Sequence, residues 1–301
     1  MARASLREVI FNPAKIIKHM GGLGYLKWIP DKLYLNICYK AAFGKKLNLE
    51  NPETFNEKLQ WLKLYNRKEI YTSMVDKYEV KKYVADIIGE KYIIPTYGVW
   101  ENFDDINFSK LPDKFVLKCT HDSGGIVICK DKKSFDLKKA RSKINKSMKR
   151  RFFYVGREWP YKNVKPRIIA EKYMETQESD DLQDYKLMCF GGKVYYTLVC
   201  QDRYANSGLR ESFFDNNWNL TTFRRKNPLC KGNVQKPQSF DEMVLLAEKL
   251  SDKIPFLRVD FYEIDGRPYF GEMTFFPGNG FEKFEPDEYD LCLGELINLP
   301  K

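Results

Sequence analysis

Histidine is nearly absent from this chain of 301 residues, which contains only His19 and His121. A hydrolase with a Ser-His-Asp triad needs a histidine as its base, and histidine-rich metal centres need several. We therefore expect neither kind of site. The chemistry of this protein is expected to depend on lysine, arginine, aspartate and glutamate side chains.

Long apolar segments and paired cysteines are also missing. No apolar run approaches the roughly twenty residues that span a bilayer, and residues 1–8 lack the apolar core of a signal peptide. The seven cysteines are odd in number and form no Cys-x-x-Cys pair, which argues against a disulfide framework and a zinc site. The sequence therefore predicts a cytoplasmic protein whose cysteines are small core residues.

Positive charge is in excess, with a formal net charge of +10 and a pI of about 9.0. The excess indicates an anionic partner, but composition does not choose among nucleic acid, membrane, nucleotide and acidic glycan. Residues 138–151 are either the solvated face of a helix or a polyanion-binding stretch. Residues 14–46 mix lysines with Ile, Leu, Tyr and Trp, and they either pack on the rest of the protein or lie on a membrane surface.

The chain is long enough for one composite domain or two joined lobes. Short helices are expected over residues 1–75, and another helix over 76–88. Strand-like runs follow at 114–118, 125–130, 167–175, 184–191, 193–202, 256–263 and 267–275. Ser134 is expected to cap a helix to about residue 151, and residues 239–242 form a capping box for a helix to about residue 252. These elements predict an α+β fold with largely antiparallel sheets.

A lysine and a glycine loop follow the first apolar strand. Residues 115–126 place Lys118 just before a small polar loop that contains His121, Ser123, Gly124 and Gly125. Such a loop lets backbone N–H groups approach phosphate oxygens, and the lysine adds a point charge. The loop matches neither a Walker nor a Rossmann pattern. An ordinary hairpin with a solvated lysine is the other interpretation.

Two further strands carry charged residues in an apolar context. The strand at 167–175 ends with Glu171, Lys172, Tyr173 and Met174, which either line an adenine edge or simply end a strand at the surface. In the strand that begins at residue 184, alternation places Asp184 and Lys186 on one face. They either form a structural ion pair or hold a ribose hydroxyl and a phosphate.

Residues 257–280 contain the most informative pattern. Two apolar strands flank an Asp-Gly turn, with Arg258 and Asp260 on one face of the first strand and Glu272 and Thr274 on one face of the second. A carboxylate in an apolar strand is costly to bury without a partner. Two carboxylates on adjacent strands form an oxygen site for Mg²⁺ that can bridge nucleotide phosphates. A structural ion pair is the alternative.

The metal interpretation sets a condition on this hairpin. A two-residue Asp265-Gly266 turn would place residue 260 opposite residue 271, so that Asp260 and Glu272 would face opposite ways. We therefore predict a three-residue loop over 264–266, with Gly266 left-handed as a bulge and Glu263 opposite Arg267.

Taken in order, these segments resemble the ATP-grasp superfamily. Its metal motif looks like Arg258-x-Asp260 followed by Glu272-x-Thr274, and the motif of its peptide-forming members looks like Asp184-x-Lys186 with Arg203. The resemblance implies Asp260, Glu272 and Thr274 as metal ligands, although Thr274 replaces the usual asparagine. It implies Arg258, Arg203 and Lys186 as catalytic residues. The nucleotide-binding residues that it implies are Lys77, Lys118, His121, Ser123, Gly124, Gly125, Glu171, Lys172, Tyr173, Met174, Asp184 and Lys186.

A closer resemblance covers residues 33–292. The segments 51–61, 76–78 and 270–278, which include Asn-Pro-Glu-Thr-Phe-Asn-Glu-Lys-Leu, are similar to the TupA-like ATP-grasp family, named for teichuronopeptide synthesis. The likeness implies a helical region at 1–75 in place of the usual preceding α/β domain. It also implies an ATP-grasp domain at 76–301, with a small ATP lobe at 91–175 and a large lobe with the metal site at 176–301.

The activity implied is that of an ATP- and Mg²⁺-dependent, ADP-forming ligase. It would join a uronic acid carboxylate of a cell-surface polysaccharide to an amine or amino acid, with an acidic glycan as partner and no nucleic acid. Contact with the inner face of the membrane through the basic N-terminal region is a further expectation. The alternatives are a kinase with the same fold, a glycosyltransferase, and a polyanion-binding protein without catalysis.

Overall fold

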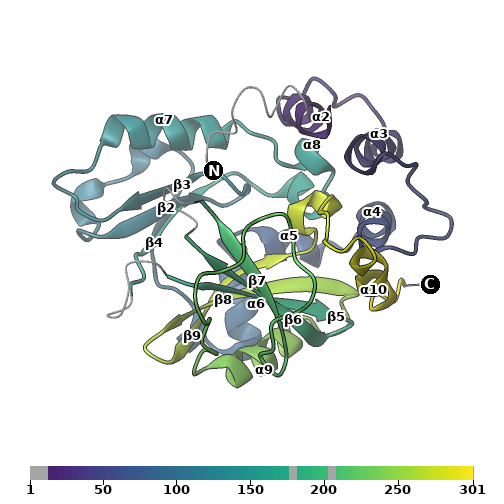
Figure 1. Ribbon diagram of the computed structural model, residues 1–301. Coiled ribbons are helices and arrows are strands. Elements are labelled where there is room, and N and C mark those ends of the chain that lie inside the picture. The colour runs from purple at the N-terminus through teal and green to yellow at the C-terminus, as the bar shows by residue number, and fades with distance from the viewer. Residues whose placement is uncertain (1–12, 176–181, 203–207, 301) are drawn as a thin grey trace.

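Two antiparallel sheets form the centre of the computed structural model, which describes residues 13–175, 182–202 and 208–300 (Figure 1). The small sheet has the strand order β1-β4-β2-β3, and the large sheet has the order β7-β6-β5-β8-β9. The strands are β1 (Thr96–Trp100), β2 (Phe115–Cys119), β3 (Ile126–Cys129), β4 (Ile168–Lys172), β5 (Asp184–Phe190), β6 (Lys193–Gln201), β7 (Arg210–Asp215), β8 (Phe256–Ile264) and β9 (Arg267–Thr274). The predicted α+β fold with antiparallel sheets is confirmed.

One face of the small sheet is apolar and covered by a helix. Alternation along β2 turns Phe115, Leu117 and Cys119 toward a buried cluster that includes Ala140 and Ile144 of α7 (Leu137–Met148). Val116 and Lys118 therefore point to the opposite face. That face is available for the site described below.

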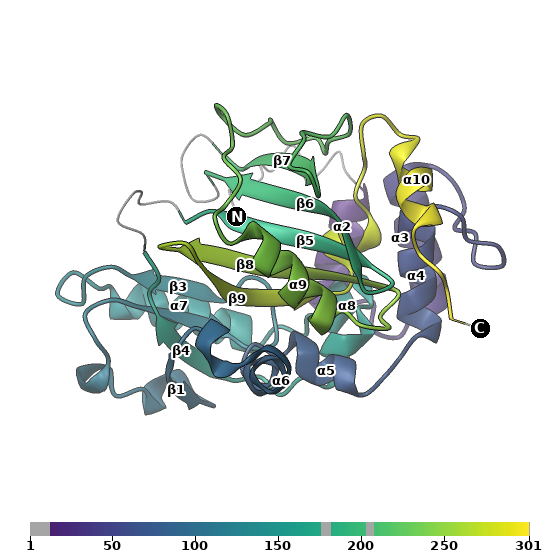
Figure 2. The same ribbon diagram turned by 90° about the horizontal axis from the view of Figure 1, so that it is seen from below.

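The large sheet is built on the same principle. Cys189 of β5 packs against α9 (Phe240–Leu250), which lies across one face of the sheet beside α6 (Glu79–Ile88) (Figure 2). The alternate residues of β5 and β8, including Lys186 and Asp260, project from the other face. These charged side chains therefore lie on the face turned away from α9.

The N-terminal part is helical, as predicted. Its helices are α2 (Pro13–Gly22), α3 (Asp31–Phe43), α4 (Phe55–Tyr65) and α5 (Ile70–Val75), and the remaining ones are α8 (Phe153–Gly156) and α10 (Tyr289–Glu295). Short 3-10 helices are η1 (Glu90–Tyr92), η2 (Phe103–Asp105), η3 (Phe108–Lys110), η4 (Trp159–Asn163) and η5 (Pro277–Gly280). No helix in the described ranges is both long and apolar enough to cross a membrane. All seven cysteines are free, and five of them are buried, which agrees with their interpretation as core residues.

The Asn-Pro-Glu-Thr-Phe-Asn-Glu segment joins α4 to α10. Thr54 caps α4 in a capping box with Glu57. The buried Asn56 donates from its side chain to Asp290 Oδ1 (2.8 Å) and to the Glu282 carbonyl (2.8 Å), and its own Oδ1 accepts from the Glu282 backbone N–H (3.1 Å). The segment is therefore a structural clamp, and Asn56, Glu282 and Asp290 are not among the residues that line the cavity described below.

Several local expectations were wrong. Asp136, not Ser134, caps α7, because its side chain accepts from the Lys139 N–H (2.9 Å). Ser239 precedes α9 but makes no capping bond, since its N–H and hydroxyl both donate to Glu263 (2.7 and 2.5 Å). The strands β1 and β7 were not predicted at all. Both lie at sheet edges. The side chains of β1 are exposed or half-buried throughout, which weakens its apolar pattern, whereas β7 is mostly buried but has charged residues at three of its six positions.

The predicted three-residue loop of the β8–β9 hairpin is also wrong. Ile264 pairs with Arg267 across a two-residue turn, in which Asp265 (φ 52°) and Gly266 (φ 72°) are both left-handed, as a type I′ turn requires. The register then shifts between Asp260 and Phe261, so that Phe261 pairs with Phe270 but Asp260 pairs with Glu272. Gly271 is the extra residue of this bulge. The carboxylates of Asp260 and Glu272 consequently share a face, as the metal interpretation requires, because of this bulge and not because of a three-residue loop.

Candidate functional site

A cavity of about 270 Å³ lies between the two sheets. The small sheet contributes Lys118 and Glu171, and the large sheet contributes Asp184, Asp260 and Glu272. Apolar side chains complete the lining, among them Val80, Ile93, Ile126, Tyr173, Met174, Tyr262 and Phe270. The cavity thus combines apolar walls with charged groups, as ligand sites commonly do.

On the small-sheet wall, two lysines grip one buried carboxylate. Lys118 Nζ lies 2.6 Å from Glu171 Oε2, and Lys81 Nζ lies 2.5 Å from Glu171 Oε1. Burial alone would raise the pKa of Glu171, but the charges of Lys118 and Lys81 outweigh it and lower the pKa to about 2. The ion cluster therefore holds a net positive charge at the cavity wall.

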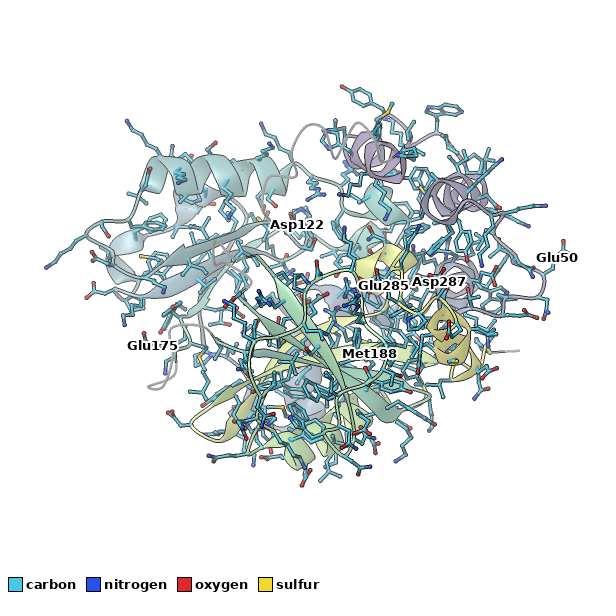
Figure 3. The ribbon with its side chains drawn as sticks, viewed as in Figure 1. Glu50, Asp122, Glu175, Met188, Glu285 and Asp287 are labelled. Carbon is cyan, nitrogen blue, oxygen red and sulfur yellow. The ribbon has the colours of Figure 1, made fainter. Side chains whose placement is uncertain are left out.

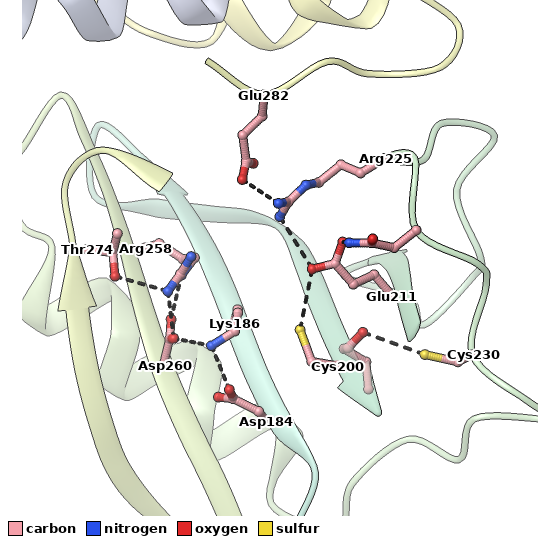
Figure 4. Close-up of polar contacts among 12 residues, drawn as sticks. Asp184, Lys186, Cys200, Glu211, Arg225, Cys230, Arg258, Asp260, Thr274 and Glu282 are labelled. Carbon is pink, nitrogen blue, oxygen red and sulfur yellow. Dashed lines mark hydrogen bonds and ion pairs between the residues drawn. The ribbon is translucent and has the colours of Figure 1, made fainter. Parts of the chain in front are cut away.

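On the large-sheet wall, a charged row crosses three strands (Figure 4). Lys186 on β5 is opposite Asp260 on β8, which is opposite Glu272 on β9. Lys186 Nζ contacts Asp260 Oδ2 and lies 2.7 Å from Asp184 Oδ2. The side chains of Asp184, Lys186 and Asp260 are all less than 10% exposed, so their positions are fixed by their mutual charges.

Arg258 contacts the two carboxylates of this charged row, Asp260 and Glu272. Its Nε lies 2.7 Å from Asp260 Oδ1, and its Nη2 donates to Asp260 Oδ2 (2.8 Å), Glu272 Oε1 (3.0 Å) and Thr274 Oγ1 (3.0 Å). Burial lowers the pKa of this guanidinium, but Asp260 outweighs burial and raises it. Arg258 is therefore a permanently charged group held by several acceptors.

The paired carboxylates have the donor chemistry that Mg²⁺ prefers. Mg²⁺ usually binds proteins through one or two carboxylates and completes its shell with water and substrate phosphates. Glu272 is the more open of the two, because its side chain is 43% exposed and that of Asp260 only 2%. Burial would raise the pKa of Glu272, but Lys186, Arg258 and Lys77 lower it, so the carboxylate stays ionised. Across the described ranges no set of three or more His, Cys, Asp or Glu side chains is arranged as a metal site, so substrate phosphates would have to supply further ligands.

The structure brings most of the sequence-derived candidates together. Lys77, Lys118, Glu171, Lys172, Tyr173, Met174, Asp184, Asp260 and Glu272 line the cavity. Lys186 and Arg258 lie beside it and contact the lining residues Asp260 and Glu272, and Thr274 is connected to it through Arg258. Arg203 falls outside the described residues. Thr274 accepts a hydrogen bond from Arg258, so in this structure it positions the arginine.

The glycine loop is placed differently from the other candidates. His121, Ser123, Gly124 and Gly125 are not among the cavity-lining residues in the described part of the chain. The N–H groups of Gly124 and Gly125 donate to Asp122 Oδ1 (3.2 and 2.9 Å), and His121 Nε2 lies 3.1 Å from the Arg150 carbonyl. Figure 3 shows Asp122 and Glu175 at opposite ends of the small sheet. The N–H groups of the loop are thus taken up by its own aspartate. The loop is connected to the cavity through Lys77, whose Nζ contacts the Asp122 carbonyl, and through Ile126, whose N–H donates to the Gly124 carbonyl (3.0 Å).

Sequence reasoning missed two groups of charged residues. Lys81 of α6 lies four residues after Lys77, which is in the turn before that helix, and it also lines the cavity. The four-residue spacing of the two lysines was the available signal. On the same face as Lys186, Arg225 contacts Glu282 and lies 3.5 Å from Glu211 (Figure 4). A second cavity of about 10 Å³ separates Arg225 and Glu282 from Arg258. These residues are far apart in sequence, so no local pattern reveals them.

Comparison with known proteins decides the family. A family model described as TupA-like ATPgrasp matches residues 57–298. The chain belongs to this family. A search of curated proteins gave no significant match.

Members of several ligase groups are similar in structure to this TupA-like ATP-grasp protein. D-alanine–D-alanine ligase from Bacillus anthracis, complexed with ATP, shares 15% identity at a TM-score of 0.42, over 74% of this chain and 65% of the ligase. The corresponding enzyme from Helicobacter pylori shares 16% at 0.40, over 83% and 70%. L-amino acid ligase from Bacillus licheniformis shares 14% at 0.44, over 75% and 49%. This chain therefore spans about two thirds or less of the first and third of these proteins.

Proposed function

We propose that this TupA-like ATP-grasp protein is an ATP- and Mg²⁺-dependent ligase that joins a carboxylate to an amine and forms ADP. The observation that carries the proposal is the cavity with lysines on one wall and the paired carboxylates Asp260 and Glu272 on the other. Phosphoryl transfer from a nucleoside triphosphate needs cationic side chains that contact the phosphates and carboxylates that hold the metal ion. Family membership supports the same assignment.

ATP would bind along the cavity. Its apolar lining, including Tyr173, Met174 and Phe270, suits an adenine ring. Lys77, Lys118 and Lys186 are the proposed phosphate contacts. Each of these lysines already has a protein partner that fixes it within or beside the cavity, so the positive charges are in place before the nucleotide arrives.

Asp260 and Glu272 would hold Mg²⁺. When bound, the ion would neutralise phosphate charge and polarise the transferred phosphoryl group. Arg258 is fixed beside both carboxylates, and it would stabilise negative charge on the transferred group and on the oxyanion formed when the amine attacks. Arg203 is proposed as a second cation for the same charge.

The reaction needs an activated carboxylate. A free carboxylate resists attack by an amine because its carbon is electron-rich and its oxygen leaves poorly. Transfer of the γ-phosphoryl group makes phosphate the leaving group, and amine attack then releases phosphate and forms the amide. No cysteine nucleophile is required. Burial raises the pKa of both Cys119 and Cys189 to about 12, so these thiols stay protonated.

For the substrates we propose a uronic acid of a cell-surface polysaccharide and an amine or amino acid. The resemblance of residues 51–61 and 270–278 to the teichuronopeptide family supports this choice. The net charge of +10 also suits an acidic glycan.

The test is ATP turnover against a panel of uronic acid glycans and amino acids, with ADP and phosphate measured separately. We expect both products only when the glycan and the amine are present together, and an amide mass on the glycan. ADP without free phosphate, with a phosphorylated sugar and no need for amine, would identify a kinase. AMP with pyrophosphate, or turnover of a sugar nucleotide without ATP, would overturn the proposal.

A further inference from the structure

A group of large apolar side chains is exposed on the N-terminal helices. It comprises Met20 (39% exposed), Leu23 (60%), Tyr25 (67%), Trp28 (76%), Leu33 (52%) and Ile37 (39%), which we call the N-terminal face. Exposed apolar residues scattered singly over a surface are ordinary, whereas these six come from the 18 consecutive positions 20–37. These six residues fall within one stretch of α2, the following turns and α3.

The surroundings of the N-terminal face are strongly basic. Residues 13–46 contain the seven lysines 15, 18, 27, 32, 40, 45 and 46 and a single acidic residue, Asp31, so this segment carries 7 − 1 = +6 of the protein's formal +10. Asp31 is itself paired with Arg67 (2.9 Å) and Arg157 (3.4 Å). Lys27, Lys32 and Lys40 are exposed.

The segment that bears this face is firmly held. The buried Arg157 donates to the carbonyls of Leu26 (2.8 Å) and Ile29 (3.1 Å), and its guanidinium stacks on Tyr34 at 4.3 Å. The Tyr34 hydroxyl donates to the Val155 carbonyl (3.0 Å). The inner side of α3 is packed in its own apolar cluster. The outer apolar side chains are therefore presented by a fixed scaffold.

We propose that the N-terminal face docks the protein onto an anionic membrane surface. Exposed aromatic and aliphatic side chains among lysines are the chemistry of interfacial membrane binding, in which apolar groups enter the headgroup region and lysines meet anionic lipids. A polyanionic glycan in solution would use the lysines and could stack its sugar rings on Trp28 and Tyr25, but it would gain nothing from the exposed aliphatic side chains such as Leu23 and Leu33. A second copy of this chain would bring like charges together.

The position of the face suits docking. In Figure 1 the helices α2 and α3 lie at the upper right of the molecule and α9 lies at its lower edge. Membrane binding through α2 and α3 would leave the large sheet and the helix α9 that covers it away from the membrane. Because the helices that the structure describes are too short or too polar to cross a bilayer, the contact would be peripheral and sensitive to salt.

Sedimentation of the full chain with vesicles tests the proposal. We expect binding to mixed phosphatidylglycerol–phosphatidylcholine vesicles, and on the order of tenfold weaker binding to pure phosphatidylcholine vesicles or at high salt. All five tryptophans fall within the described ranges, and Trp28 is the only one classed as exposed. Brominated lipids should therefore quench the fluorescence of the wild type and have much less effect on a Trp28→Phe variant.

Paired variants locate the surface. Tyr25→Ser with Trp28→Ser, and separately Lys27→Glu with Lys32→Glu, should each weaken vesicle binding about tenfold or more. The control variants on the opposite side are Tyr195→Ser with Leu245→Ser, and Lys249→Glu with Lys253→Glu. They also replace exposed apolar and lysine side chains, and they should bind vesicles as the wild type does. Circular dichroism confirms folding of each variant.

Three results would overturn the proposal. They are absence of vesicle binding by the wild type, equal loss of binding in the controls, and self-association that the Tyr25/Trp28 variant abolishes. The last would assign the face to a second copy. Because the assay needs neither ATP nor substrate, its outcome is independent of the proposed ligase activity.

Discussion

Asp260 and Glu272 are partners across two strands, yet their environments differ. Asp260 is almost fully buried and is held by both Lys186 and Arg258, so its loss would leave two buried cations side by side. Glu272 opens into the cavity and contacts Arg258 through one oxygen. A change at Asp260 therefore disturbs folding as well as chemistry, whereas a change at Glu272 isolates the chemistry.

The first prediction concerns Glu272→Gln. We expect Mg²⁺-dependent turnover to fall on the order of a hundredfold, because a metal clamp contributes several kcal/mol, while the free energy of unfolding changes by less than about 1 kcal/mol. Kinetics and urea denaturation measure the two quantities. The control is Glu175→Gln, another exposed carboxylate that lines the same cavity. Wild-type turnover in Glu272→Gln would remove this carboxylate from the metal site.

The second prediction concerns the pH dependence of stability through Glu171. Its pKa is lowered to about 2 in the folded protein, against about 4.3 in an unfolded chain. The group therefore adds stability that is fully present above about pH 4.3 and is lost as the pH falls toward 2, by an amount on the order of 3 kcal/mol. Urea denaturation between pH 5 and pH 3 should show a smaller loss of stability for Glu171→Gln than for the wild type.

The control for this experiment is again Glu175→Gln. Glu175 pairs with Lys114 at 2.8 Å, but both side chains are about half exposed, so water and salt screen the pair. Its pH dependence should match that of the wild type. Identical slopes for the wild type and Glu171→Gln would show that the two lysines do not hold Glu171 ionised.

At the scale of elements, the clamp between α4 and α10 carries the third prediction. Asn56 is fully buried, and its side chain bonds to Asp290 and to both backbone groups of Glu282. Asn56→Ala should lower the free energy of unfolding by about 2–3 kcal/mol, because buried groups of its partners lose their bonds. Asn36→Ala is the matched control, since Asn36 donates only to the Lys32 carbonyl at an exposed position.

The clamp has little contact with the cavity, so the Michaelis constant for ATP should be unchanged in Asn56→Ala. A large rise in that constant at normal stability would contradict the structural role. This outcome matters for interpreting the family, because the most recognisable segment in the sequence marks a packing requirement and not a catalytic group.

The elements also show how far the sequence alone leads. The charged residues of β5, β8 and β9 were placed on the correct faces because strand alternation is a local rule. The predicted hairpin loop was wrong because the bulge at Gly271, five residues after the turn, restores the shared face. Without a bulge, a two-residue Asp-Gly turn would place Asp260 and Glu272 on opposite faces of the sheet, and a bulge leaves no clear mark in a sequence. Ser239 was misread because Glu263, its actual partner, is distant in the chain.

At the scale of the whole molecule, the cavity depends on both sheets. Lys118 and Glu171 come from the small sheet, whereas Asp184, Asp260 and Glu272 come from the large sheet. Each sheet has its own buried cluster. A ligand that fills the cavity would therefore contact residues of both sheets. Such a ligand should stabilise the fold by RT ln(1 + L/Kd), where L is its free concentration, and this amount grows with the logarithm of its affinity.

The last prediction uses this linkage to locate ATP. At a nucleotide concentration of about a hundred times Kd, binding should stabilise the wild type by about 2.7 kcal/mol, which raises Tm by roughly 4 °C for a chain of 301 residues. Lys118→Met should keep a fold of near-normal stability, because Lys81 still neutralises Glu171, but its Tm should rise far less with ATP. Lys186→Met is the poorer probe, since it removes the cation that Asp184 and Asp260 share and leaves only Arg258 to neutralise this buried pair.

Lys114→Met is the matched control for this measurement. Lys114 precedes the same strand as Lys118 and also pairs with a carboxylate, but it does not line the cavity. Its thermal shift with ATP should equal that of the wild type, whereas an equal reduction in Lys114→Met and Lys118→Met would indicate a general effect of lost charge. A full ATP shift in Lys118→Met would place the nucleotide elsewhere. That result would separate the cavity from the reaction, because the proposed ligase chemistry requires the phosphates to lie between Lys118 on one sheet and the carboxylates of the other.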